Sequence, residues 1–160
     1  MANRHHVMRN VSVFYRLTQM YFSDKLKPYN LGSGQQYFLL QISRYPGASL
    51  AELADLGAFD NCTVTRAVQK LESVGYIRVE RCPRDHRAKR LYLTEEGEAL
   101  IAPIRSMIGE WMAAVTDGFT EEEKETVGAL VGRLADNARA ILAERSRPDD
   151  GADSSKEDRR

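Results

Sequence analysis

The chain has 160 residues, of which 42% are hydrophobic and 29% charged, with a formal net charge of zero. This composition provides for one folded core and excludes a mostly disordered chain. Two cysteines, Cys62 and Cys82, are too few for a disulfide framework, and their spacing matches no common zinc site. Because no apolar run is long enough to span a membrane, we expect a cytoplasmic protein without membrane contacts, and no cofactor is indicated.

The zero net charge hides an uneven distribution along the chain. Residues 61–90 hold eight Lys and Arg against three Asp and Glu, a net charge of +5. Residues 91–143 hold four against ten, a net charge of −6. A basic middle segment followed by an acidic helical segment indicates that one face of the protein meets an anion.

The first half of the chain predicts four helices. Apolar residues recur at helical spacing over 7–27, which Pro28 ends, and a second helix is expected over 33–44. A capping box at Ser49-Leu50-Ala51-Glu52 begins a short third helix, which we expect Gly57 to end. Asp60 is placed to cap a fourth helix, which ends at Gly75. Two short helices joined by a tight turn form a helix-turn-helix unit.

A β-hairpin and two long helices are predicted next. Strands are expected over 76–80 and 89–93, joined by a basic turn over 83–88. Thr94 is placed to cap a long helix that continues to Val115. A second capping box at Thr120-Glu121-Glu122-Glu123 begins the last helix. Its apolar stripe consists of Val127, Leu130, Val131, Leu134, Ala138, Ile141 and Leu142.

The expected fold is mainly α (α+β), a winged helix-turn-helix flanked by N- and C-terminal dimerisation helices. The flanking helices carry more apolar surface than the central unit can cover, so we expect two chains to pack these helices together as a homodimer. This organisation assigns a dimerisation helix to residues 1–30 and the DNA-binding region to 31–97. It assigns further dimerisation helices to 98–145 and a disordered tail to 146–160, where the composition turns charged and small.

The fourth predicted helix has an apolar face and a face of residue types that read DNA. The apolar face holds Val64, Ala67, Val68, Leu71 and Val74, and the opposite face holds Cys62, Thr65, Arg66, Gln69, Lys70 and Ser73. Arginine can pair with a guanine edge and glutamine with an adenine edge, while hydroxyls bind phosphates. A solvated surface helix would carry the same residue types, and it is the flanking elements that favour DNA. The predicted contacts are Asn61, Thr63, Thr65, Arg66, Gln69 and Lys70.

The hairpin concentrates positive charge around its turn, at Arg81, Arg84, His86, Arg87, Lys89 and Arg90. Charges on a sheet edge also protect it from aggregation, but charges this dense repel one another unless an anion is present. A wing placed at the minor groove would supply that anion, and Asp85 can hold the guanidinium of Arg87 in one pose. The predicted wing contacts are Arg84, Asp85, Arg87, Lys89 and Arg90.

The motif Asp-x-Arg-x-x-x-Leu-x-Leu-Thr-x-x-Gly, here Asp85, Arg87, Leu91, Leu93, Thr94 and Gly97, resembles the signature of the MarR (multiple antibiotic resistance regulator) family. Residues 53–54, 63–68 and 71–77 are similar to that family's helix-turn-helix, and the resemblance covers roughly residues 10 to 143. It implies a homodimeric repressor or activator on a pseudo-palindromic double-stranded DNA operator, released by a small, often aromatic or phenolic, ligand. It also implies that Arg87 is the minor-groove arginine and Asp85 its positioning partner.

The residues that would sense a signal are less clearly marked. A ligand pocket of the family's kind would draw on Tyr15, Arg16, Tyr37, Phe38 and Trp111, with rings to stack and Arg16 to pair a carboxylate. Aromatic residues at helical spacing are, however, more often core or dimer interface. A redox switch at Cys62 is an alternative, because that thiol lies at the positive end of a helix beside basic residues. The family's peroxide-sensing branch has its cysteine near the start of the first helix, and this chain has none there.

An enzyme is not expected. The chain has no glycine-rich phosphate loop and no defensible Ser/His/Asp arrangement, and its three histidines leave little for acid–base chemistry. A winged-helix module that binds an acidic protein is the other alternative. Salt separates the two, because affinity for DNA falls steeply with ionic strength when phosphates are neutralised.

Overall fold

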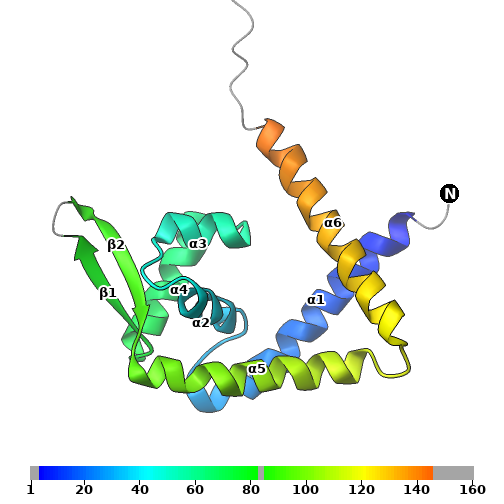
Figure 1. Ribbon diagram of the computed structural model, residues 1–160, viewed down its shortest axis with the longest axis horizontal. Coiled ribbons are helices and arrows are strands. Elements are labelled where there is room, and N and C mark those ends of the chain that lie inside the picture. The colour runs from blue at the N-terminus through cyan, green and yellow to red at the C-terminus, as the bar shows by residue number, and fades with distance from the viewer. Residues whose placement is uncertain (1–3, 83–84, 146–160) are drawn as a thin grey trace, which may run out of the picture. The chain divides into compact units, whose positions relative to one another are not determined.

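The structure is a computed structural model that describes residues 4–82 and 85–145, with the backbone alone for residues 4, 5, 82, 85–88 and 145. Figure 1 shows the order of the elements, which confirms the predicted winged helix-turn-helix. They are α1 (Arg4–Leu26), the 3-10 helix η1 (Lys27–Tyr29), α2 (Gln35–Arg44), α3 (Leu50–Gly57), α4 (Asn61–Ser73), β1 (Ile77–Cys82), β2 (Asp85–Leu93), α5 (Glu95–Val115) and α6 (Glu121–Arg145). The chain forms two compact units, one up to Ala114 and one from Val115.

Side-chain caps begin both helices of the helix-turn-helix, as predicted. The Ser49 hydroxyl accepts from the Glu52 N–H at 3.2 Å, and the Glu52 carboxylate accepts from the Ser49 N–H at 2.7 Å. Asp60 Oδ1 accepts from the Thr63 N–H at 2.8 Å at the start of α4. These bonds satisfy N–H groups that a helix leaves without internal partners, so they fix where α3 and α4 begin.

The predicted end of α3 at Gly57 is confirmed, but the capping position is the next residue, Ala58. Gly57 is the last helical residue, and Ala58 takes the left-handed conformation, with φ 52°. A Cβ on Gly57 would collide with the ring of Phe59. The glycine is therefore required for close packing, while its neighbour adopts the backbone geometry that ends the helix.

The hairpin is longer than the sequence predicted. Its antiparallel ladder pairs Ile77 with Leu93 and Arg81 with Lys89, and β2 already begins at Asp85. The predicted turn over 83–88 is therefore wrong for 85–88. The register shifts between Arg81 and Cys82, so the ladder is irregular there and accommodates extra residues in β2.

The link from β2 to α5 explains the Leu-Thr-x-x-Gly part of the motif. The Thr94 N–H donates to the Tyr76 carbonyl at 3.1 Å, and the Thr94 hydroxyl donates to the Gly75 carbonyl at 2.6 Å. The same hydroxyl oxygen accepts from the Gly97 N–H at 3.1 Å, which is the predicted cap. A Cβ on Gly97 would collide with the Tyr76 carbonyl oxygen, so only glycine permits this approach.

One hydrophobic core lies under the winged unit. The apolar face of α4 enters it as predicted, with Val74 only half-buried. Leu100, Ile101 and Ile104 from the first half of α5 belong to the same core. The fully buried large side chains are Leu26, Leu39, Ile42, Leu53, Leu71, Leu91, Ile104 and Val64. Because α4 and both strands of the hairpin pack on this core, their relative positions are fixed.

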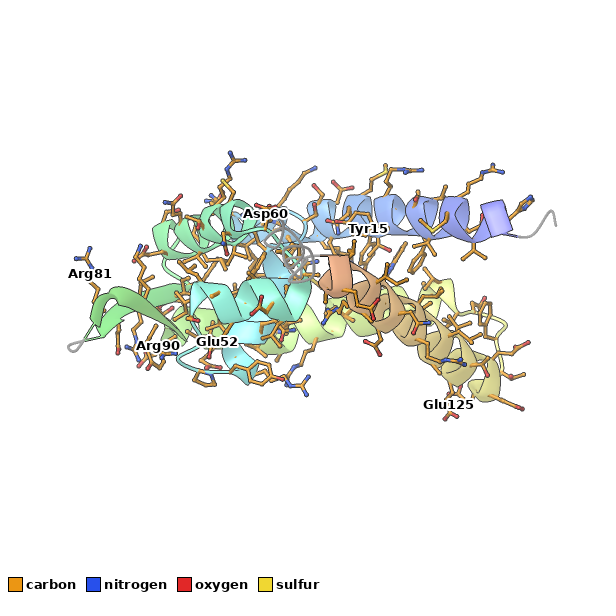
Figure 2. All side chains as sticks on the ribbon, turned by 90° about the horizontal axis from the view of Figure 1, so that it is seen from above. Tyr15, Glu52, Asp60, Arg81, Arg90 and Glu125 are labelled. Atoms are coloured by element: carbon orange, nitrogen blue, oxygen red, sulfur yellow. The ribbon has the colours of Figure 1, made fainter. Side chains whose placement is uncertain are left out.

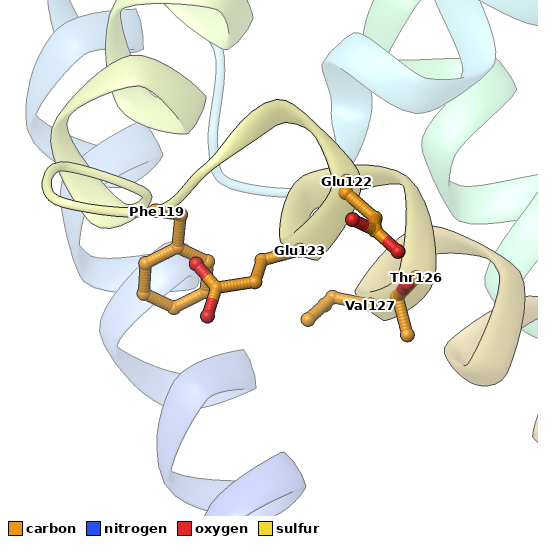
Figure 3. Close-up of a pocket in the computed structure, with 5 residues that line it drawn as sticks. All are labelled: Phe119, Glu122, Glu123, Thr126 and Val127. Carbon is orange, nitrogen blue, oxygen red and sulfur yellow. The ribbon is translucent and has the colours of Figure 1, made fainter.

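The second unit contains α6. Its predicted capping box is present, because the Thr120 hydroxyl accepts from the Glu123 N–H at 3.2 Å and the Glu123 carboxylate accepts from the Thr120 N–H at 2.8 Å. A shallow hollow of about 320 Å³ at this end is lined by Phe119, Glu122, Glu123, Thr126 and Val127 (Figure 3). The predicted tail over 146–160 lies outside the described residues. No helix in the described segments has both the length and the apolar character to cross a membrane.

Candidate nucleic-acid interface

Helix α4 presents its polar face to solvent. Val64 and Leu71 on the opposite face are fully buried, so the orientation of the helix about its axis is fixed. Arg66 and Gln69 are exposed and Lys70 is half-buried. No hydrogen bond or ion pair engages these three side chains within the described part of the chain. They are therefore available to an external partner.

Two predicted contacts on α4 already have partners inside the helix. The Thr63 hydroxyl donates to Asp60 Oδ2 at 2.7 Å, and the Thr65 hydroxyl donates to the Asn61 carbonyl at 2.7 Å. Their hydrogens are thus committed, although their oxygens can still accept. Arg66, Gln69 and Lys70 thus keep polar hydrogens that Thr63 and Thr65 have already committed within the protein.

Carboxylates at the starts of α3 and α4 are held in their charged form. The pKa of Asp60 lies below its usual value because the hydroxyl and the backbone N–H of Thr63 donate to it. The pKa of Glu52 is also lowered, first by the Ser49 N–H, then by the Ser49 hydroxyl, and further by the charge of Arg90. Each negative charge faces the positive end of its helix, where it is stabilising.

The cations of the hairpin fall into two groups. Arg81 and Lys89 pair across the strands, are exposed and have no partner within the described residues, and Figure 2 shows Arg81 directed away from the hairpin. Arg78 instead forms an ion pair with Glu80 and lies 4.6 Å from the centre of the Tyr92 ring. Among the hairpin cations whose side chains the structure describes, the first group is the one free to bind an anion.

Arg90, predicted as a DNA contact, is engaged by the protein itself. Its Nη1 donates to the Gly47 carbonyl at 3.1 Å and lies 3.4 Å from Glu52 Oε2. Arg84 lies outside the described residues, as do the side chains of Asp85 and Arg87. Their predicted pairing therefore stays a prediction.

A known family accounts for this combination of a capped polar helix and a basic wing. A model of the MarR family matches residues 33–89. The HTH-type transcriptional regulator YybA of Bacillus subtilis is 32% identical over 132 residues, which cover 82% of this chain and 87% of YybA. The chain belongs to the MarR family. It is a DNA-binding transcriptional regulator, as the sequence motif indicated.

Solved MarR structures agree with the fold. A MarR transcriptional regulator from Methanosarcina mazei Go1 superimposes with a TM-score of 0.81 at 30% identity, over 86% of this chain and 99% of that one. A MarR protein from Peptoclostridium difficile gives a TM-score of 0.83 at 28% identity, over 88% of this chain and 92% of that one.

The predicted ligand residues lie in different surroundings. Trp111 packs on α1, with ring centroids 4.6 Å from Tyr21 and 6.3 Å from Phe14, and its Nε1–H donates to the Thr18 hydroxyl at 3.1 Å. Trp111 is only half-buried, so one part of this cluster remains accessible. The contact joins α1 to α5 within one unit.

Tyr37 and Phe38 belong to a second aromatic cluster. Their ring centroids lie 5.4 and 5.0 Å from that of Phe59, and Phe38 is buried. Tyr15 and Arg16 are exposed on α1. The structure thus brings Tyr37 and Phe38 together in the core and places Trp111 in the other cluster.

Cys62 is a free, exposed thiol in the first turn of α4, on the predicted DNA-reading face. Oxidation of the Cys62 thiol would add polar atoms to that face of α4. In the described part of the chain no group of three or more His, Cys, Asp or Glu residues is arranged to hold a metal ion.

Proposed function

We propose that this protein is a homodimeric repressor that binds a pseudo-palindromic operator and leaves it when a small aromatic or phenolic ligand binds. The observation that carries the DNA-binding part is the free polar face of α4, which lies over a buried apolar face and precedes a basic hairpin. In this arrangement α4 enters the major groove and the hairpin contacts the minor groove.

Arg66 is the residue on which base reading chiefly depends. An arginine that forks onto a guanine contributes about 1–3 kcal/mol of discrimination, so Arg66→Ala should weaken binding to the operator by about tenfold to a hundredfold. The matched control is Arg105→Ala, which removes an exposed arginine from α5 in the same unit. Equal effects of the two substitutions in an equilibrium binding assay would contradict the role of α4.

A second prediction concerns the contact of the hairpin with the minor groove. Arg87→Ala should weaken operator binding strongly, because a minor-groove arginine lies in a narrow slot of negative potential. The substitution should also lower the dependence of affinity on salt. An Arg87→Ala protein that binds as tightly as the parent would contradict the proposed contact of the wing.

Dimerisation is proposed from the apolar surfaces of α1 and α6, each considered by itself. On α6, Leu130, Val131, Leu134 and Ile141 are between 51% and 54% exposed, and on α1 Met8 is 70% exposed. Surfaces of this kind are normally covered in solution. We assign residues 1–30 and 98–145 to the dimer interface and residues 31–97 to DNA.

Analytical ultracentrifugation measures whether the protein is a dimer in solution. Leu134→Glu should shift the protein toward monomer and weaken operator binding, because a buried charge without a partner is costly. Ala129→Glu places the same charge on the opposite side of α6 and should leave the dimer intact. A parent protein that sediments as a monomer, or equal effects of the two variants, would overturn the proposal.

Ligand control is supported by the accessible cluster around Trp111, the only tryptophan in the chain. A protein of the same fold, BpsR of Bordetella bronchiseptica, is 19% identical, and its DNA binding is regulated by 6-hydroxynicotinic acid. A gel shift on the protein's own upstream DNA with a panel of aromatic carboxylates tests this control. Release by one compound, with a change in Trp111 fluorescence, is the expected result.

Redox control is the second candidate, favoured by the exposure of Cys62 on α4. If oxidation regulates the protein, peroxide should release the parent from DNA and leave the Cys62→Ser variant bound. If peroxide has no effect on either protein, the redox candidate is excluded. Release by a ligand but not by peroxide would favour the aromatic effector.

A further inference from the structure

Arg90 joins two parts of the winged unit that are distant in the sequence. Its Nη1 donates to the Gly47 carbonyl at 3.1 Å and lies 3.4 Å from Glu52 Oε2. Gly47 lies between α2 and α3, and Glu52 belongs to the capping box of α3. Figure 2 shows Glu52 and Arg90 beside each other, where the base of the hairpin meets α3.

The backbone around Arg90 is tied to the same segment. The Gly47 N–H donates to the Leu91 carbonyl at 2.8 Å, and the Leu91 N–H donates to the Ala48 carbonyl at 3.0 Å. Gly47 adopts a φ of 83°, and an added Cβ there would lie 3.0 Å from Tyr92 Oη. Hydrogen bonds from the side chain of Arg90 and from the backbone of Leu91 thus converge on Gly47 and Ala48, in the segment that precedes α3.

We infer that Arg90 is a positioning residue, which holds the wing against α3 through Glu52 and Gly47 and does not bind phosphate. The inference rests on the DNA binding described above. Glu52 accepts from Ser49 to cap α3 and also faces Arg90, so one carboxylate connects the start of the helix-turn-helix to the wing. Lys89 is adjacent in the sequence but exposed and without a described partner, and it is the phosphate-binding cation of this pair.

The direction in which one substitution changes the affinity for DNA distinguishes a positioning role from a purely electrostatic one. Glu52 brings a negative charge close to the proposed DNA surface, so its neutralisation should strengthen binding if only charge matters. If Glu52 positions Arg90 and the wing, its neutralisation should weaken binding. Glu52→Gln is a suitable change, because glutamine at this position preserves a capping box.

The experiment is a double-substitution cycle on operator affinity over a salt series, using Glu52→Gln, Arg90→Gln and the double variant. Each single change should weaken binding about two- to fivefold, as expected for an exposed ion pair. The operator affinity of the double variant should equal that of whichever single variant binds less tightly, because both changes remove the same interaction. Lys89→Gln is the matched control. It should make the negative slope of log Kobs against log salt shallower by about 0.9, because one phosphate contact is lost. Arg90→Gln should make the slope shallower by less than half of that amount.

Three results would overturn the inference while DNA binding itself stands: tighter or unchanged binding by Glu52→Gln, additive effects of the two substitutions, or a slope loss for Arg90→Gln equal to that for Lys89→Gln. Circular dichroism and the melting temperature must match the parent, so that misfolding is not read as a binding effect. A parent protein that binds no DNA at any salt concentration would overturn both the inference and the proposed function.

Discussion

Replacing Gly97 with alanine should destabilise the winged unit, although alanine is the better helix former. Gly97 lies in the first turn of α5, and its Cα faces the carbonyl of Tyr76 so closely that an added Cβ would collide with the oxygen. That carbonyl also accepts from the Thr94 N–H at 3.1 Å. To relieve the collision, either the backbone at Tyr76, just before β1, or the first turn of α5 must shift.

The magnitude follows from three opposing contributions. Forced overpacking costs about 1–3 kcal/mol. Weakening the hydrogen bond from Thr94 to Tyr76 costs about 0.5–1.5 kcal/mol. Alanine returns about 1 kcal/mol through its higher helix propensity. The net expectation for Gly97→Ala is a destabilisation of about 0.5–3.5 kcal/mol.

Urea unfolding followed by circular dichroism at one fixed protein concentration measures this change. Gly109→Ala is the matched control, because Gly109 lies in the same helix with no described atom within 4 Å of an added Cβ. It should stabilise the protein by about 0.5–1 kcal/mol. Effects of the same sign for the two substitutions would refute the reasoning about the junction between β2 and α5.

Other substitutions probe the core, a half-buried hydroxyl and a cap. Leu71→Ala should cost about 2–5 kcal/mol in urea unfolding, because Leu71 is fully buried on α4. Tyr76→Phe should cost about 0.5–1.5 kcal/mol in the same assay, because its hydroxyl donates to the Tyr29 carbonyl at 3.0 Å. The lowered pKa of Asp60 means that its stabilisation is present above the unfolded pKa of about 3.9 and is lost as the pH falls below it. Parent stability should therefore fall relative to Asp60→Asn between pH 6 and pH 3 in thermal melts, and a constant difference would contradict the cap.

Local signals account for most of what could be predicted. The caps at Ser49, Asp60, Thr94 and Thr120 depend on residues within one helical turn, so sequence alone was sufficient to place them. The apolar face of α4 followed from helical spacing in the same way. A face and a start residue together determine which side chains point outward, which is why the exposed polar face of α4 could be predicted.

Contacts between distant residues explain what could not be predicted. Arg90 stays a predicted DNA contact, but its hydrogen-bond partners Gly47 and Glu52 lie 43 and 38 residues away and could not be predicted. Gly57 ends α3 as predicted, but the packing of Phe59 against it and the left-handed conformation of Ala58 could not be predicted. No local pattern carries this information, because it arises only when the elements pack.

The most direct test of the account is the affinity of the parent protein for its own upstream DNA and for unrelated DNA of equal length, measured over a salt series. The account predicts binding to its own DNA at least about 10³-fold tighter, with an affinity that falls steeply as salt rises. Equal affinity for the two DNAs would contradict sequence-specific recognition by α4. Affinity that does not change with salt would contradict phosphate contacts by the wing.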